Sequence, residues 1–189
     1  MITRWLQFIS ATALLVATAG DLRADLQPGS VARITFRDVD GNDHSTSAGY
    51  VTIITVASRE NADKAKAVAD RVPDRYIGNP QYRYLTVVNF QGRIPRALQG
   101  VTRGIIRQRL ENEAKRFRAS YQAKKIPRDP RRDLYAVADF DGSAARQLGL
   151  APESNAVTVF VFNGQGKLIA RWTDLPPNDT LAAAIAAAD

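Results

Sequence analysis

The chain has 189 residues, of which 45% are hydrophobic, so it is long enough to bury one ordinary hydrophobic core. It contains no cysteine and one histidine, which excludes disulfides, thiolate nucleophiles, cysteine-ligated metal centres and multi-histidine metal sites. Lys and Arg outnumber Asp and Glu by 26 to 19, and the resulting charge of +7 favours acidic partners or surfaces.

Residues 1–19 have the pattern of an export signal. Residues 6–16 are dominated by apolar and small side chains, and small residues then lead up to Ala19. We expect cleavage after Ala19, with Ala24 as the alternative. An uncleaved membrane anchor would need about 20 apolar residues, more than this run provides. The pattern therefore predicts an exported, periplasmic protein whose mature domain, residues 20–189, has no transmembrane segment.

Apolar runs predict six strands in the rest of the chain. The first alternates apolar and polar side chains, whereas the next three are nearly continuous in apolar character, as in strands covered on both faces. The last two flank an Asn-Gly-Gln-Gly stretch, which is a hairpin signal. In chain order the predicted strands are residues 31–36, 50–57, 84–90, 134–139, 156–162 and 167–172.

Four helices are predicted between and after these strands, at residues 59–72, 98–124, 143–148 and 179–188. Ser58 is expected to cap the first helix. The second and longest helix has an apolar face, for which the sequence offers Val101, Ile105, Leu110, Ala114, Phe117 and Tyr121. The alternation of buried strands and helices predicts an α/β protein with a mixed sheet and a single domain.

Three stretches carry a resemblance to a known superfamily, and their order and spacing are its specific part. They are Val51–Asp63, Leu134–Leu150 and Asn155–Ile169, which resemble the strand-to-helix turn, the strand-Asp-Gly-helix stretch and the strand-turn-strand of exported redoxins. Segment Glu153–Val159 is similar to the cysteine-less periplasmic YtfJ type. The resemblance spans residues 28–188 and implies a thioredoxin-like three-layer sandwich, with a central mixed β-sheet flanked by helices.

The sequence departs from that superfamily at its reactive positions. Where redox-active members have two cysteines, this chain has Glu60 and Asp63, and where they have a cis-proline it has Val157 or a neighbour. Together with Ser58 and Arg59, these residues would form the vestige of a redox corner. We expect Glu60 to act as an ordinary first-turn acid, stabilised by a few tenths to about 1 kcal/mol by the helix dipole. Thiol-dependent oxidoreductase or peroxidase activity is excluded, because no cysteine is present.

A hydrolytic site would need a base and an oxyanion hole beside Ser58. The one histidine, His44, lies in a polar loop and is expected to be solvated there, with no sequence link to Ser58. Asp38, Asp40 and Asp43 surround Gly41 in the same loop and are expected to serve turn geometry, since the spacing lacks the glutamate of a calcium loop. We therefore expect no catalytic residue, metal site or cofactor.

A rival hypothesis keeps an enzyme at the same corner. It would use chemistry that needs no thiol at Ser58 and Glu60, with Arg59 holding an anionic substrate. This alternative predicts an open pocket where the first helix begins.

Positive charge is concentrated in residues 93–132, which contain thirteen basic residues and three acidic ones. The candidates for anion binding are Arg103, Arg107, Arg116, Arg118, Lys124 and Lys125. An exported protein would meet anionic lipid, acidic glycans or an acidic protein rather than nucleic acid. The sequence thus favours a redox-inactive, exported binding or adaptor module, whose partner is a protein or an acidic envelope ligand.

Overall fold

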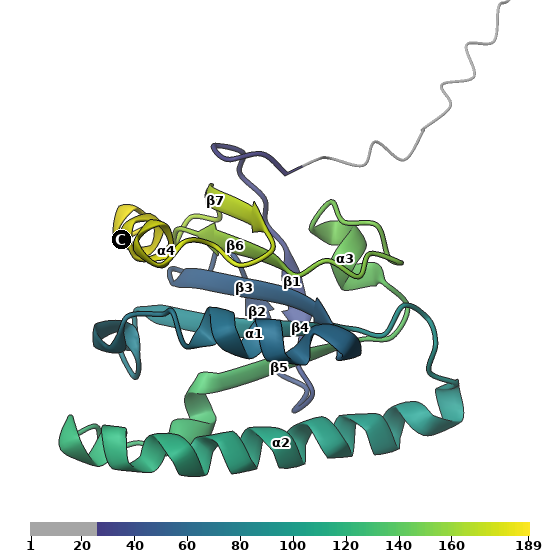
Figure 1. Ribbon diagram of the computed structural model, residues 1–189, viewed down its shortest axis with the longest axis horizontal. Coiled ribbons are helices and arrows are strands. Elements are labelled where there is room, and N and C mark those ends of the chain that lie inside the picture. Colours follow the sequence, from purple (N-terminus) through teal and green to yellow (C-terminus); the bar gives the residue numbers. More distant parts are fainter. Residues whose placement is uncertain (1–25) are drawn as a thin grey trace, which may run out of the picture.

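The computed structural model describes residues 26–189, so the predicted export signal and both candidate cleavage sites lie outside the described residues. A five-stranded mixed sheet forms the centre of the fold (Figure 1). Across the sheet its strands are β5 (Leu134–Asp139), β4 (Tyr82–Asn89), β3 (Val51–Ser58), β6 (Thr158–Phe162) and β7 (Leu168–Thr173). Strands β3, β4 and β5 run parallel, while β6 and β7 are antiparallel to their neighbours. The predicted α/β class and mixed sheet are confirmed.

Strand β3 lies in the middle of the sheet because its sequence suits burial on both faces. All eight of its residues are buried, and the run Val-Thr-Ile-Ile-Thr-Val-Ala-Ser is rich in β-branched side chains. The Asn-Gly-Gln-Gly stretch joins β6 to β7 as an antiparallel hairpin, as the sequence predicts.

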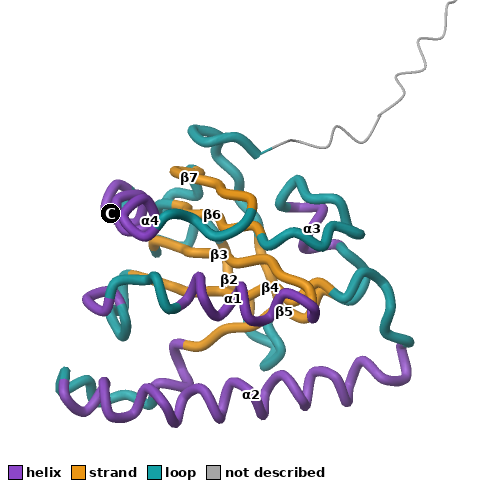
Figure 2. Tube along the Cα trace, viewed as in Figure 1, coloured by secondary structure: helices purple, strands orange, loops and turns teal. Residues whose placement is uncertain are grey.

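One face of the sheet carries three helices: α1 (Ala62–Ala69), α2 (Arg96–Ala123) and α4 (Asn178–Ala187) (Figures 1 and 2). Val68 of α1 and Leu181 and Ile185 of α4 are fully buried in a core with alternate residues of β3 and β6. Helix α2, about 42 Å long from its 28 residues, instead packs beside β5 around the buried Ile106.

The opposite face is covered by α3 (Ser143–Gln147) and by a small hairpin made of β1 (Thr35–Arg37) and β2 (Asp43–Ser45). Their side chains enclose a second core, which includes Phe36 of β1 and Phe160 of β6. Three short 3₁₀ turns complete the chain: η1 (Arg59–Asn61), η2 (Asp74–Tyr76) and η3 (Pro130–Asp133).

Two predicted elements are much shorter in the structure. The first strand comprises only β1, and Val31 makes a single isolated bridge with Lys167. The first helix starts with the 3₁₀ turn η1 and ends at Ala69 instead of continuing to Val72. Pro73 explains the early end, because a residue that precedes proline disfavours helical geometry and the last turn unwinds.

Asp38 organises the loop between β1 and β2, which confirms the predicted turn. Its Oδ1 accepts the backbone N–H groups of Asp40 at 2.9 Å and Asn42 at 2.8 Å. The prediction for His44 is wrong: this residue is buried, its Nε2 lies 2.8 Å from Oδ2 of Asp38, and its ring lies 4.4 Å from that of Tyr135. Because His44 pairs with an inward-facing residue of β1, the register turns its imidazole toward the core.

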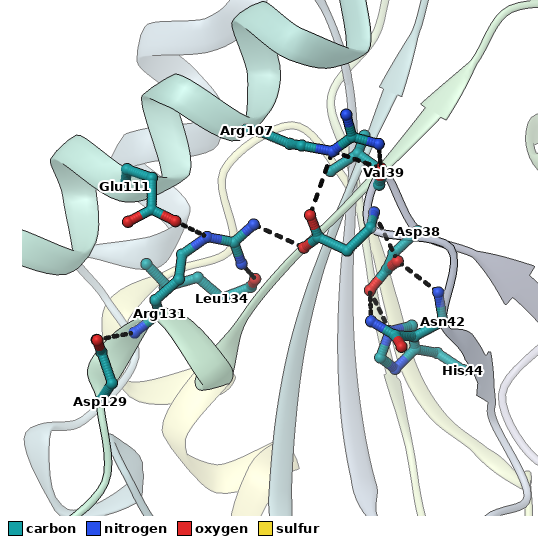
Figure 3. A network of polar contacts seen from close by, with 10 residues as sticks. Asp38, Val39, Asn42, His44, Arg107, Glu111, Asp129, Arg131 and Leu134 are labelled. Atoms are coloured by element: carbon teal, nitrogen blue, oxygen red, sulfur yellow. Dashed lines mark hydrogen bonds and ion pairs between the residues drawn. The ribbon is translucent and has the colours of Figure 1, made fainter.

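A network of polar contacts ties α2 to this loop and to the start of β5 (Figure 3). Arg107 of α2 donates through Nε to the Val39 carbonyl at 2.8 Å and lies 3.3 Å from the Asp40 carboxylate. Arg131 of η3 contacts Asp40 at 2.6 Å and also Glu111 of α2 at 3.1 Å. Only 17% of the Arg131 side chain is exposed, so these contacts are partly shielded from solvent.

Within residues 26–189, no helix combines the length and the apolar character that crossing a membrane requires.

We predict that Arg131→Met lowers the free energy of unfolding by about 1–3 kcal/mol, since it leaves Glu111 without an ion pair and Asp40 with only the half-exposed Arg107. Urea denaturation measures the change. The neighbouring Arg132→Met is the control, because Arg132 is exposed and has no ion pair within the described part of the chain; its effect should stay within about 0.5 kcal/mol. Equal losses in both variants would contradict the network's role.

The buried Asp38 gives a second prediction, on pH. Burial acts to raise its pKa, but hydrogen bonds from His44 and Asn42 outweigh this and lower the pKa overall. Its stabilising contribution is therefore complete above the pKa of an unfolded aspartate, about 3.9, and is lost as the pH falls through the folded-state value. Asp38→Asn should destabilise the protein at pH 7 and flatten the decline in stability in acid. Urea titrations from pH 7 downward check this, and parallel profiles for the two proteins would contradict it.

Candidate functional site

A row of three buried polar residues ends the parallel strands. Ser58, Asn89 and Asp139 are the last residues of β3, β4 and β5 and lie opposite one another in register. Their exposed fractions are 4%, 3% and 2%. Ligands commonly bind at the carboxyl ends of parallel strands, so the contacts of this row decide what the edge can do.

All three side chains bind the segment between β5 and β6. The Ser58 hydroxyl donates to the carboxamide oxygen of Asn155, and the Asn89 amide donates to the Pro152 carbonyl at 2.7 Å. Oδ2 of Asp139 accepts the backbone N–H of Ala145 at 2.9 Å. The row therefore fastens α3 and the loop after it to the edge of the sheet.

Ser58 is not the helix cap that the sequence predicts. Its side chain makes no capping bond, since its hydroxyl is directed to Asn155. Asn61 joins this contact by donating to Ser58 Oγ at 3.3 Å and to the backbone carbonyl of Asn155. As His44 is held by Asp38, the serine has an asparagine rather than an imidazole as its partner, which gives it no general base.

Asp139 has a buried carboxyl group whose pKa is raised. Burial raises the pKa of this carboxyl, and the N–H groups of Ala145 and Ala144 offset the rise only in part. Its Oδ1 is buried and has no hydrogen-bond partner among residues 26–189. Asn89 and Asp139 were not among the predicted site residues; the signal for them in the sequence is a polar residue at the end of each of two apolar strands.

The other residues of the predicted corner lie outside this row. Arg59, Glu60 and Asp63 are exposed, and Glu60 pairs with Arg93 at 3.1 Å. Glu60 sits in η1, so Asp63 rather than Glu60 is the acid in the first turn of α1. Val157 is buried in the core, and its carbonyl accepts the Asp174 N–H at 2.7 Å. The structure thus brings Ser58, Arg59 and Glu60 to one corner but keeps Val157 as a core residue.

An open cavity of about 390 Å³ adjoins this corner, as the enzyme hypothesis predicts. Its lining is rich in polar side chains. They belong to Ser58, Arg59, Glu60, Asn89, Gln91 and Arg93.

A larger groove, of about 960 Å³, opens from the same place. Helices α1 and α2 form its walls and β4 its floor, through alternate residues such as Tyr84 and Thr86. The groove and the smaller cavity share four lining residues: Ser58, Arg59, Phe90 and Ile94. The two hollows are therefore continuous at the Ser58 corner.

The position of α2 explains why the groove stays open. The expected apolar face of this helix included Val101 and Ile105, but these are 62% and 52% exposed. The buried residues of α2 are Ile106, Ala114 and Tyr121, which face β5 and η3. Ile105 lines the groove, whereas Val101 does not. The apolar face of α2 thus includes residues that do not pack in the core, and one of them, Ile105, borders the groove.

The six basic residues predicted to bind anions do not form one free surface. Arg103 lies over the ring of Phe140 at 4.9 Å, and Arg107 joins the network described above. Arg116 pairs with Glu113 at 3.0 Å, and Lys124 with Asp74 at 3.0 Å. Within residues 26–189, only Arg118 and Lys125 of the six have no such partner.

Two further observations bear on the chemistry of the site. Within the region described, no cluster of three or more His, Asp or Glu side chains is arranged to hold a metal ion. On the groove floor, burial raises the pKa of Tyr84 to about 12, and its hydroxyl lies 2.9 Å from that of Thr55. Tyr84 is therefore neutral at physiological pH and already hydrogen-bonded.

Ser58→Ala tests the structural role of the serine. We expect a loss of about 1 kcal/mol in the free energy of unfolding, because Oδ1 of Asn155 loses its buried donor and keeps only the exposed contact with Asn61 Nδ2 at 3.2 Å. Ser120→Ala on α2 is the control, since the Ser120 hydroxyl has no partner among the residues described and its loss should change stability by under about 0.5 kcal/mol. Thermal unfolding followed by circular dichroism distinguishes the two, and an unchanged Ser58→Ala midpoint would refute this role.

No protein-family model matches the chain, and no curated protein matches it in sequence. Solved structures do match. A putative thioredoxin from Neisseria meningitidis is 15% identical with a TM-score of 0.53, over 86% of this chain and 91% of that one. A peroxiredoxin-like protein from Aquifex aeolicus is 14% identical with a TM-score of 0.52, over 87% and 89%. An exposed lipoprotein thioredoxin from Streptococcus pneumoniae is 15% identical with a TM-score of 0.50, over 82% and 99%. These likenesses, which concern the fold alone, show that the chain is a cysteine-less protein with the thioredoxin-like fold.

Proposed function

We propose that this protein is a redox-inactive binding protein of the cell envelope, which holds an apolar ligand in the groove between α1 and α2. The observation that carries the proposal is the groove itself: about 960 Å³, bordered by Ile105, Ile106 and Phe117 of α2 and by the small side chains of α1. Pockets that bury small ligands are concave, mostly apolar and of about 300–1,000 Å³.

The contacts of the corner favour binding over catalysis. A thiol is absent from the chain, and the Ser58 hydroxyl is engaged by Asn155. The cavity beside Ser58 has the open shape that the enzyme alternative predicts. The side chains of Asn89 and Asp139, however, hydrogen-bond to the α3 segment, where they stabilise the fold.

Placement in the envelope rests on the pattern of residues 1–19, which is typical of an export signal. One neighbour in fold is described as an exposed lipoprotein. The likeness to the YtfJ type, which is also periplasmic, supports the same placement but rests on the short segment Glu153–Val159.

Fluorescence of the neutral apolar probe N-phenyl-naphthylamine tests the groove. We expect saturable binding to the purified protein, and Ile105→Glu should weaken it by about tenfold or more, because a carboxylate on the groove wall must be desolvated when the probe binds. Val101→Glu is the matched control: Val101 is a comparably exposed β-branched residue on the same helix, but it lies outside the groove lining.

Equal weakening by both substitutions would locate the probe elsewhere on α2, and a lack of saturable binding would refute the proposed function. Circular dichroism of the variants checks that the fold is retained, which the exposure of both side chains favours.

A further inference from the structure

The two hollows at the Ser58 corner differ in chemistry. The groove between α1 and α2 is mainly apolar, while the smaller cavity of about 390 Å³ is lined by Arg59, Arg93 and the side chains of Asn89 and Gln91. They meet at Arg59, which lines both. A single ligand could therefore place an aliphatic chain in the groove and a polar end in the cavity.

The charges of the two hollows favour an anionic end. Each of the four acidic residues that line the groove has a basic partner, through the pairs Asp70–Lys66, Asp74–Lys124, Glu113–Arg116 and Asp133–Arg128. The side chain of Arg59, in contrast, has no hydrogen bond or ion pair within residues 26–189. The pair between Arg93 and Glu60 at 3.1 Å is more than half exposed on both sides, so it is weak and open to exchange.

The floor of the groove offers little to a polypeptide backbone. Strand β4, its floor, is paired on both edges, so no strand can be added there. The hydroxyls of Tyr84 and Thr102 are already bonded, to Thr55 at 2.9 Å and to the Leu98 carbonyl at 3.0 Å. A peptide would bury its own polar groups against this surface at a cost, whereas an aliphatic chain has none to satisfy.

The first described residue, Leu26, does not reach the groove. It is buried in the core on the α3 face, opposite the face that carries the groove.

We infer that the ligand is an aliphatic amphiphile with one anionic headgroup, whose chain lies in the groove and whose headgroup is bound by Arg59, with Arg93, in the smaller cavity. This inference rests on the proposed function and names the ligand class for the same site. The guanidinium of Arg59 suits a carboxylate or phosphate headgroup, because its fork can donate two parallel hydrogen bonds to either.

Isothermal titration calorimetry with three matched probes tests the inference: decanoate, decanol and decyltrimethylammonium, which share chain length and differ in charge. We expect decanoate to bind at least tenfold more tightly than the other two. Arg59→Gln should lower the affinity for decanoate by about tenfold, because one partly exposed charge-assisted contact is lost, and should leave the affinity for decanol unchanged.

Arg96→Gln is the control for Arg59→Gln. Arg96 is exposed, lies at the corner end of α2, has no ion pair among the residues described and lines neither hollow. It should leave all three affinities within about twofold, since only long-range, screened attraction is removed.

A second variant acts in the opposite direction. Glu60→Gln removes the competing partner of Arg93 and a repulsive charge from the cavity lining. It should therefore raise the affinity for decanoate by about two- to fivefold without changing the affinity for decanol.

The outcomes separate the two proposals. Equal affinity for decanoate and decanol, or equal losses in Arg59→Gln and Arg96→Gln, would overturn the inference while leaving an apolar binding groove in place. Failure of all three probes to bind would overturn the inference, and with a negative naphthylamine result the proposed function as well. Binding of an acidic amphipathic peptide but not of decanoate would also overturn it.

Discussion

The attachment of α2 to one edge of the sheet is the constraint on which the rest of this molecule depends. Asp40 lies between two arginines, Arg107 on α2 and Arg131 on η3, and Arg131 also reaches Glu111 of α2. These contacts hold the middle of the helix beside β5, where Ile106 completes a small core. Because a straight helix fixed there cannot also close on α1, the face of β4 between the two helices remains open. A groove bordered by apolar side chains is the result.

The two faces of the sheet differ in how their polar residues are engaged. On the α3 face, Ser58, Asn89 and Asp139 are buried and give their hydrogen bonds to the segment before β6. On the other face, Arg59 follows Ser58 directly and is exposed at the meeting point of the two hollows. The polar atoms of this strand edge stabilise the scaffold, and the two hollows lie beside Arg59.

The strands and the fold could be predicted because their signals are local. The run Val51–Ser58 and the hairpin at residues 158–173 show their burial and turn chemistry within a few residues. The site could be predicted only in part, because its contacts join distant segments. Ser58 resembles a helix cap in sequence, yet it donates to a partner 97 residues away. Helical periodicity likewise identified an apolar stripe on α2, but it cannot say which part of the stripe meets the sheet, since that depends on the network around Asp40.

The arrangement of charge at the corner also shows why a surplus of basic residues is a poor guide by itself. Part of the positive charge between residues 93 and 132 is used inside the molecule, as Arg107 and Arg131 illustrate. A guanidinium that stabilises the fold has already exchanged solvent for a carboxylate and has little left to offer a ligand. Arg59 is different, because it borders a cavity without a partner within residues 26–189. Its significance comes from an unpartnered side chain that borders both hollows, and net charge alone would not have singled it out.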